Sequence, residues 1–411
     1  MTRSGLVALA LAGCLLLAGC SAPAGSGPET TGPLTPVSET AVGPVEVVNG
    51  TLPVDENRTF RRVAGLVDAR PDAPVVYVGS IRPLFGFGNR ERSPFFRTFW
   101  LGTPNPRAET DRVTVGAATN AYGTVYIVPG SPPDDDEVER TLAHEYTHVA
   151  QFERGIYTSL ESRAPEEYAG TTDSRMARRS LVEGAAVYVS SAYAERYLPD
   201  AETEAALLDS VYDDVSAATR YYWGPYRFGY EYVAARADST AAHWSLYDEP
   251  PRTTEQVLHD ESPETEPREP FAVTDRLPDA AITERDTKGE LVTRTVLSST
   301  LSPDRAADAA AGWAYDRAVT VERGRDRGIV WVHRLDDRAE ATELRSAFRA
   351  TLADRGDGAG TGWTTPNGTY RLLAPGDRTV VVAGGSDPIL DGLSATVGDG
   401  GDVTIGTNGR G

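Results

Sequence analysis

The amino-acid sequence predicts an α+β protein, in which a mainly helical domain with a small β-sheet precedes a small C-terminal α+β module. Three features indicate this class. Two long segments, 134–155 and 176–197, carry apolar residues at helical spacing. Short runs of β-branched and aromatic residues lie just before the first of them, within 113–128. The segment 318–382 reads as strand, strand, helix, strand, strand, an order typical of a small α+β module.

The first part of the folded chain is expected to contain one helix and three short strands. Apolar residues at helical spacing predict a helix over 55–68. The run Val75–Val78 predicts a short buried strand. Glycine and proline interrupt the aromatic residues of 84–106, which predicts an irregular surface segment. Two glycines divide 113–128, which predicts a strand, a bend and a second strand.

Three helices are expected next. The first begins near Asp134, because four consecutive acidic residues there suit the positive end of a helix dipole, and it ends at Gly155. The second covers about 176–197 and the third about 221–237. The stretch 155–175 between the first two is expected to form an inserted loop.

An acidic, proline-containing segment at 260–269 predicts a domain boundary. We therefore expect one domain over 45–260 and the C-terminal module over 285–411. Within and just before that module, the predicted elements are a helical region at 289–312, strands at 318–322 and 329–333, a helix at 337–353, and strands at 370–373 and 380–382.

The charge balance is unusual. Forty basic residues against 60 acidic ones give a net charge of −20, and Lys288 is the only lysine. Strong acidity with almost no lysine indicates a surface adapted to concentrated salt, where screening removes self-repulsion. An acidic protein from a GC-rich genome is the alternative. In either case the charge argues against nucleic-acid binding.

The N-terminus predicts export and lipid anchoring. Residues 1–19 have the charge and apolar run of a signal peptide, and Leu17-Ala18-Gly19-Cys20 resembles a lipobox, so Cys20 is the expected lipidation site. Residues 20–44 are rich in Pro, Gly, Ser and Thr, which predicts a flexible tether on the membrane surface. Both cysteines lie in this N-terminal region, so a metal in the folded part must be held by histidines and carboxylates.

The strongest chemical signal is the sequence His144-Glu145-Tyr146-Thr147-His148, in the middle of the first long helix. Positions i and i+4 lie one above the other on a helix face, so both imidazoles can bind one ion. Glu145 is placed to take a proton from water beside that ion. This pattern predicts a Zn²⁺ site.

A catalytic zinc site needs a third protein ligand and an open position. Glu183 is the best candidate, because it lies in the second long helix between Val182 and a Gly-Ala-Ala sequence. We expect these small residues to let this helix pack closely against the helix that carries the two histidines.

The stretch 113–237 resembles the gluzincin zinc peptidases, in particular aminopeptidases related to leukotriene hydrolase. Those enzymes bind the substrate backbone along an edge strand with the sequence G-A-M-E-N. The corresponding segment here runs from Gly116 to Asn120 and continues to Tyr122, so the resemblance implies that these residues bind substrate. Thr119 replaces the family's glutamate, which holds the substrate amine. This difference favours an endopeptidase or an unusual substrate.

The resemblance also implies a tyrosine that stabilises the transition state, in a Y-x-x-G sequence that opens a later helix. Tyr221 fits this sequence, and Tyr222 and Tyr226 are rivals. Two departures from the family remain. An insertion puts 34 residues between His148 and Glu183, and Val187 stands where thermolysin-like enzymes have an aspartate.

These features together predict a zinc metallopeptidase on the cell surface that cleaves peptides or proteins, with Glu145 as general base. The alternative is a lipid-anchored binding protein with a vestigial or structural zinc site, in which the C-terminal module recognises a partner. Outside the motif, His243 and His333 are expected to be structural. A structural, hydrogen-bonded role is also favoured for His259, and a place in the active-site cleft is its alternative.

Overall fold

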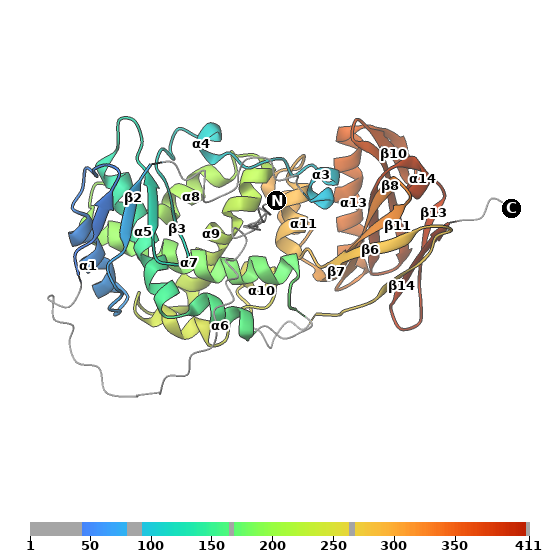
Figure 1. Cartoon of the computed structure of the whole chain (residues 1–411). Coiled ribbons are helices and arrows are strands. Elements are labelled where there is room, and N and C mark those ends of the chain that lie inside the picture. The colour runs from blue at the N-terminus through green and yellow to red at the C-terminus, as the bar shows by residue number, and fades with distance from the viewer. Residues whose placement is uncertain (1–42, 80–92, 164–167, 263–267, 408–411) are drawn as a thin grey trace, which may run out of the picture. The chain divides into compact units, whose positions relative to one another are not determined.

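The computed structural model describes residues 43–79, 93–163, 168–262 and 268–407. It confirms the α+β class (Figure 1). The expected signal peptide (1–19), the lipidation site Cys20 and nearly all of the tether (20–44) lie outside the described residues. The chain forms two compact units: unit 1 takes the described residues of Met1–Arg90 and Val115–Ser162, and unit 2 those of Glu91–Thr114 and Arg163–Gly411.

Unit 1 contains a four-stranded sheet in the order β1-β2-β4-β3. The parallel strands are β1 (Glu46–Val48), β2 (Val75–Val78) and β4 (Val125–Val128). Strand β3 (Gly116–Thr119) runs antiparallel to β4 and forms one edge of the sheet. The predicted strand, bend and strand over 113–128 are therefore confirmed, as a β3–β4 hairpin.

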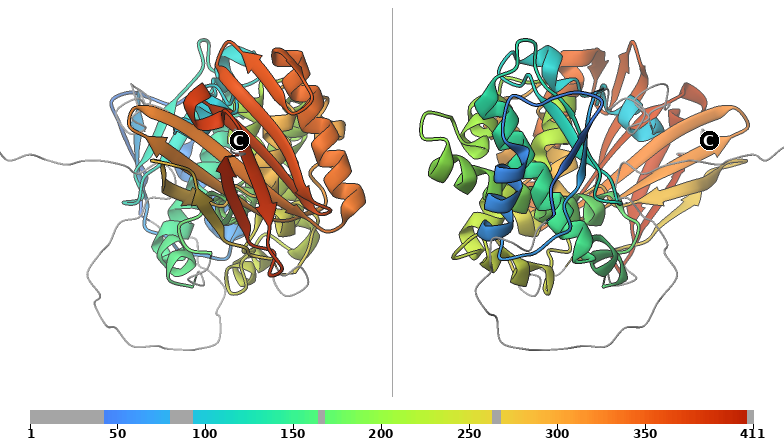
Figure 2. Two further views of the ribbon diagram at one scale, coloured as in Figure 1. Left: turned by 90° about the vertical axis from the view of Figure 1, so that its right-hand side faces the viewer. Right: turned by 60° about the vertical axis from the view of Figure 1, so that its left-hand side comes forward.

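The described residues of unit 1 include three helices: α1 (Glu56–Leu66), α5 (Asp135–Glu153) and α6 (Ile156–Ser162). Helix α1 packs on α5, where the rings of Phe60 and Tyr146 meet edge to face at 5.0 Å between centroids. Helix α5 in turn contacts β3 and β4. Figure 2, right view, brings this unit forward. The helices predicted at 55–68 and 134–155 are confirmed.

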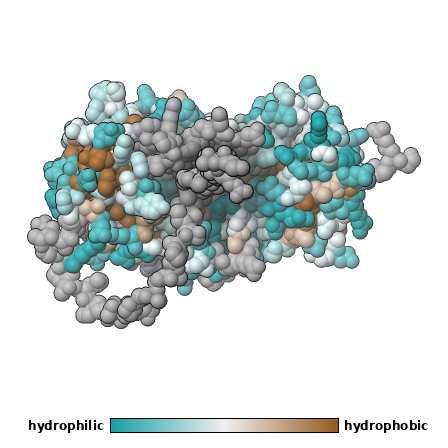
Figure 3. Space-filling model, in the orientation of Figure 1, coloured by the Kyte–Doolittle hydropathy of each residue, from teal (hydrophilic) through white to brown (hydrophobic). Residues whose placement is uncertain are grey.

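Two expectations for unit 1 are wrong. Strand β2 is buried only on one face: Val76 is fully buried, whereas Val75 and Tyr77 are 37% and 38% exposed. Alternating side chains point to opposite faces of a sheet, and Figure 3 shows apolar surface in the region of β2. The expected loop at 155–175 also differs, because its first part forms α6.

Unit 2 begins with two short helices and continues with a helical region. The helices predicted at 176–197, 221–237 and 337–353 are confirmed as α7, α9 and α13, with α7 and α9 starting four residues earlier than expected. The region predicted at 289–312 consists of two short helices, α11 and α12. The helical elements are α3 (Pro94–Thr98), α4 (Pro106–Glu109), α7 (Thr172–Tyr197), α8 (Glu204–Tyr212), α9 (Ala217–Arg236), η1 (Ala242–Tyr247), α10 (Thr254–Leu258), α11 (Glu290–Leu297), α12 (Pro303–Asp308), α13 (Arg338–Arg355) and α14 (Asp387–Leu390).

The C-terminal part of unit 2 holds two sheets. A seven-stranded antiparallel sheet has the order β6-β7-β8-β12-β11-β10-β9, and a three-stranded sheet has the order β13-β14-β5. The four predicted strands are confirmed as β7, β8, β11 and β12. The strands are β5 (Val273–Arg276), β6 (Ala281–Asp286), β7 (Trp313–Arg323), β8 (Asp326–Leu335), β9 (Asp357–Ala359), β10 (Gly362–Thr365), β11 (Gly368–Gly376), β12 (Thr379–Gly385), β13 (Leu393–Val397) and β14 (Val403–Thr407).

Helix α13 and the three-stranded sheet cover opposite faces of the seven-stranded sheet (Figures 1 and 2). Trp331 of β8 faces the helical side and packs with Leu344 and Phe348 of α13. Val332, the next residue, faces the other side and packs with Val403 of β14. Because successive residues of a strand point to opposite faces, one strand contributes side chains to the cores on both sides of the sheet.

The expectation of an irregular surface segment at 84–106 is wrong where the structure describes it. Residues 94–98 form α3, and Phe95 and Phe99 are buried against Trp331 with ring centroids 4.9 and 5.2 Å apart. These aromatic residues fill a core that includes Trp331, a residue more than two hundred positions later. Their burial could not be read from local sequence.

Among the described helices, none is both long enough and apolar enough to cross a membrane.

Candidate metal centre

Helix α5 begins and ends as its sequence predicts. The carboxylate of Asp134 caps the N-terminus by accepting a hydrogen bond from the Glu137 backbone N–H at 2.9 Å. Gly155 follows the last turn with a φ of +67°, a conformation that glycine adopts without steric cost. Between these ends the helix is mostly buried, and His144, Glu145 and His148 are only 5%, 5% and 7% exposed.

The two imidazoles meet as ligands of one ion would. The Nε2 atoms of His144 and His148 lie 3.1 Å apart. Two nitrogens bound to one tetrahedral zinc at about 2.0–2.1 Å would lie about 3.3 Å from each other. Adjacent turns of α5 therefore set the spacing that such a site requires.

Gln151 orients one of these rings. Its Oε1 lies 2.7 Å from Nδ1 of His148, and an amide oxygen can only accept a hydrogen bond. Nδ1 therefore carries the hydrogen, and in the neutral ring Nε2 presents its lone pair. Gln151 was not among the site residues predicted from the sequence. The signal that could have indicated Gln151 is its position three residues after His148 on the same helix, where the two side chains are neighbours.

Glu145 is hydrogen-bonded to the edge strand. Its Oε2 accepts from the hydroxyl of Thr119, the last residue of β3, at 2.6 Å. The same hydroxyl lies 3.2 Å from the Glu145 carbonyl oxygen. Thr119, the residue that replaces the amine-binding glutamate of the aminopeptidases, thus contacts the candidate general base. This contact was not predicted from the sequence.

In unit 2, α7 carries Glu183 and is anchored at its first turn. The backbone N–H and hydroxyl of Thr254, on α10, both donate to Oδ1 of Asp173, at 2.8 and 2.7 Å. The backbone N–H and hydroxyl of Thr172 donate to Asp286 at 2.8 and 2.6 Å. These bonds tie the start of α7 to two other segments of unit 2.

Gly184 allows a close approach within unit 2, between α7 and α9. The expected packing of α7 against the helix that carries the two histidines stays a prediction. A Cβ built on Gly184 would lie 2.6 Å from Cα of Gly229, on α9, and closer still to the Gly229 carbonyl group. A Cβ on Gly229 would meet the backbone of Ser180 in the same way. The two glycines let α7 and α9 cross with their backbones in contact.

Arg179 and Tyr226 surround Glu183 within unit 2. Arg179, one turn before Glu183 on α7, forms an ion pair with it, with Nε 3.4 Å from Oε1. The Arg179 guanidinium also lies over the rings of Tyr222 and Tyr226, at 4.9 and 5.5 Å. Burial, with the negative charge of Glu183 nearby, raises the pKa of Tyr226 well above its usual value. The Tyr226 hydroxyl therefore stays protonated.

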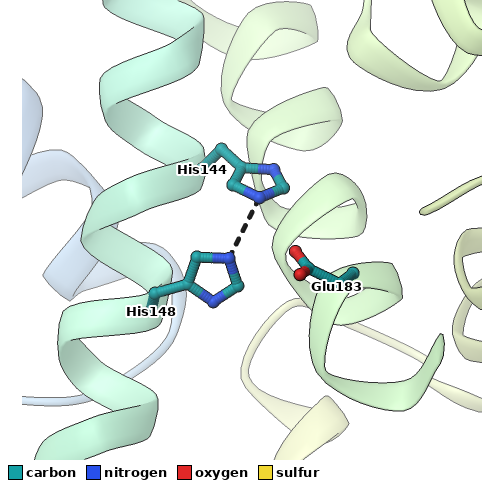
Figure 4. Close-up of side chains that lie close together, drawn as sticks. All are labelled: His144, His148 and Glu183. Carbon is teal, nitrogen blue, oxygen red and sulfur yellow. Dashed lines mark hydrogen bonds between the residues drawn. The ribbon is translucent and has the colours of Figure 1, made fainter. Parts of the chain in front are cut away.

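His144, His148 and Glu183 form a group whose donor atoms could hold a metal ion. One ligand atom from each residue lies within 4.8 Å of the others, and Figure 4 shows the Glu183 carboxylate beside the two rings. Two imidazoles and one carboxylate are a donor set that catalytic zinc sites use, with a fourth position for water. The residues therefore fit Zn²⁺.

Tyr221 lies among apolar residues. Its ring packs on Phe96 at 5.0 Å between centroids and lies against the core on the helical side of the seven-stranded sheet. Its rivals Tyr222 and Tyr226 occupy a different face of α9, the one beside Arg179. The role of Tyr221 remains a prediction.

The predicted substrate-binding residues lie along the β3–β4 hairpin. Gly116 pairs with Val128 in the sheet. Oδ1 of Asn120 accepts from the backbone N–H groups of Tyr122 and Thr124 at 2.9 and 3.0 Å, so this side chain shapes the turn. The Tyr122 side chain is 88% exposed. The role of these residues in substrate binding stays a prediction.

The other histidines are held within unit 2. Nε2 of His259 lies 2.9 Å from Oε2 of the fully buried Glu290, which raises the pKa of His259. His243 is fully buried, and its Nδ1 contacts the carbonyl oxygen of Thr240. Burial lowers the pKa of His333 to about 3, so its ring is neutral. These contacts agree with the structural roles expected for them.

Residues 276–394 match a family described as a domain of unknown function, DUF8575. This range includes the seven-stranded sheet and contains none of the candidate metal ligands. Neither the curated proteins nor the solved structures include a match to the chain.

Proposed function

We propose that this protein is a zinc-dependent endopeptidase that uses the general-base chemistry of the gluzincins. The observation that carries the proposal is the buried His144–His148 pair with its Nε2 atoms 3.1 Å apart. Glu145 lies between the two histidines in sequence, and Glu183 lies within the same group of donor atoms. A structural role alone would not require a buried glutamate beside the two ligands.

His144, His148 and Glu183 would hold the ion. When bound, Zn²⁺ would supply a Lewis acid that polarises the scissile carbonyl and makes a neighbouring water more acidic. Gln151 keeps His148 in the tautomer that can bind a metal. Arg179 pairs with the Glu183 carboxylate and restrains it.

Glu145 would act first as general base and then as general acid. Its carboxylate accepts a proton from the attacking water and then delivers that proton to the nitrogen of the leaving amine. The side chain is buried, so bulk water does not compete strongly for it.

A tyrosine of α9 would donate a hydrogen bond to the oxyanion of the tetrahedral intermediate. The resemblance to the aminopeptidases points to Tyr221. The contacts within unit 2 favour its rival Tyr226, because Tyr226 lies beside Glu183 and keeps its proton. We therefore propose Tyr226 as the donor.

The proposed substrate is an internal peptide bond of a peptide or protein. Thr119 stands at the position that binds the substrate amine in the aminopeptidases, so this position carries no acid here, and its hydroxyl is hydrogen-bonded to Glu145. The protein would be attached to the outer surface of the membrane through a lipid at Cys20, in concentrated salt, as expected from the sequence.

Cleavage of casein at molar salt, with and without a zinc chelator, tests the proposal. We expect hydrolysis that the chelator abolishes and added zinc restores. Glu145→Gln should keep zinc bound while losing turnover by about a hundredfold or more, because it removes only the base. Glu161→Gln, at an exposed position of α6, is the matched control and should keep full turnover. Unchanged turnover in Glu145→Gln would refute the proposal and favour the alternative binding protein with a structural zinc.

A further inference from the structure

The hydrogen bond between Thr119 and Glu145 has a defined direction. A carboxylate has only acceptor atoms and a threonine hydroxyl has one hydrogen, so Thr119 donates. Its distance of 2.6 Å to Oε2 is in the range of a charge-assisted bond, and the 3.2 Å distance to the Glu145 carbonyl oxygen is the weaker alternative. The hydroxyl therefore points its hydrogen at the carboxylate.

Both ends of this bond are attached to rigid backbone. Thr119 pairs with Val125 in the β3–β4 ladder, and Asn120 closes the turn that follows. Threonine is branched at Cβ, which restricts its first side-chain torsion. Glu145 lies in the buried middle of α5, which packs on β3. The donor and the acceptor are thus fixed relative to each other within unit 1.

We infer that Thr119 is a positioning residue, which holds the Glu145 carboxylate through Oε2 so that proton transfer takes place at Oε1. This inference rests on the proposed function. A glutamate side chain has three torsions and several staggered conformers, and only some of them place a carboxylate oxygen where water attacks. Misplacing a catalytic group by about 1 Å can cost about a hundredfold in rate. One donor on the edge strand removes that freedom.

Two substitutions at Thr119 test the inference. Thr119→Val keeps the shape of the side chain and removes the donor, so we expect kcat for casein-derived peptides to fall about tenfold to a hundredfold. KM should change by less than about threefold and the zinc content should stay constant, because the substitution leaves the backbone of β3 unchanged and the Thr119 hydroxyl is bonded to Glu145 and not to a candidate ligand. Thr119→Ser restores the donor and should recover most of the lost kcat.

Two results would overturn the inference. The first is wild-type kcat in Thr119→Val. The second is a Thr119→Ser enzyme as impaired as Thr119→Val, since that result would assign the effect to the methyl group and not to the hydroxyl. Thr364→Val, at an exposed position of strand β10, is the control for the same substitution in a strand and should leave kcat unchanged.

A second measurement does not depend on peptidase activity. In urea unfolding, Thr119→Val should lower the midpoint when Glu145 is present and have little effect in a Glu145→Ala background, because the bond is then already lost. An equal effect in both backgrounds would show that no such bond forms. A wild-type protein without peptidase activity would overturn the proposed function and the catalytic role of Thr119 with it, whereas this cycle would still decide whether the bond exists.

Discussion

Replacing Gly184 by alanine should loosen the metal centre without touching a ligand. The new Cβ would lie 2.6 Å from Cα of Gly229 and closer still to its carbonyl group, whereas unbonded carbon atoms prefer about 3.5–4.0 Å, so α7 and α9 must separate by about 1 Å or more. Overpacking of this kind costs about 1–3 kcal/mol, and a rigid backbone neighbour places it at the upper end. Alanine offsets about 1 kcal/mol of this because it favours a helix more than glycine does.

We therefore expect Gly184→Ala to lower the free energy of unfolding by about 2 kcal/mol. Glu183 is the preceding residue, so the same shift should weaken zinc binding by about tenfold or more. Urea unfolding of the metal-free protein measures the first effect. Competition with a chromophoric zinc chelator measures the second.

Gly65→Ala in α1 is the matched control. A Cβ at Gly65 meets no atom within 4 Å, so only the helix preference remains and stability should rise by about 0.5–1 kcal/mol. Zinc affinity should not change in this variant. If Gly184→Ala proved as stable as Gly65→Ala and bound zinc as tightly as the wild type, the close crossing of α7 and α9 at Gly184 would be refuted.

Three further predictions concern Gln151, Asp173 and Tyr226. Gln151→Leu removes the acceptor for His148 and should weaken zinc binding by about 10–100-fold, measured by chelator competition; unchanged affinity would remove Gln151 from the site. Burial raises the pKa of Asp173 to about 7, above the usual 3.8, so the folded protein holds a proton that the unfolded chain releases. The free energy of unfolding should therefore fall as pH rises from about 4 to about 7, by a few kcal/mol, and urea titrations of Asp173→Asn should lose this slope. Tyr226→Phe should lower kcat about 100-fold or more with little change in KM, whereas Tyr221→Phe should not; the reverse result would restore Tyr221 as the oxyanion donor.

Local patterns were sufficient where the interactions are local. The acidic N-terminus, the apolar spacing and Gly155 define α5, because capping, dipole and φ > 0 are properties of a few neighbouring residues. The β7–β8 hairpin was likewise predictable, since its strands are adjacent in sequence.

Packing between distant segments was not predictable. Phe95 and Phe99 follow glycines and prolines and look like part of a surface segment, yet they are buried against Trp331. The partner of Gly184 could not be deduced either, because a small residue permits a close contact without specifying which helix makes it. Such contacts depend on the tertiary arrangement.

The candidate site divides in the same way. His144, Glu145 and His148 were predictable because one helix turn sets their relation. The hydrogen bond from Thr119 to Glu145 joins a strand to a helix, and no sequence pattern predicts it. Glu183 was inferred from its helix and from family resemblance, and its ligand role is still a proposal.

The decisive measurement for the proposed zinc site is X-ray absorption at the zinc edge of the purified protein, combined with metal analysis. We expect one zinc per chain, with two imidazole nitrogens and carboxylate or water oxygens at about 2.0–2.2 Å. We also expect His148→Ala and Glu183→Ala each to lose the metal. A protein that binds no stoichiometric zinc, or one that keeps its full zinc content in both variants, would contradict the account.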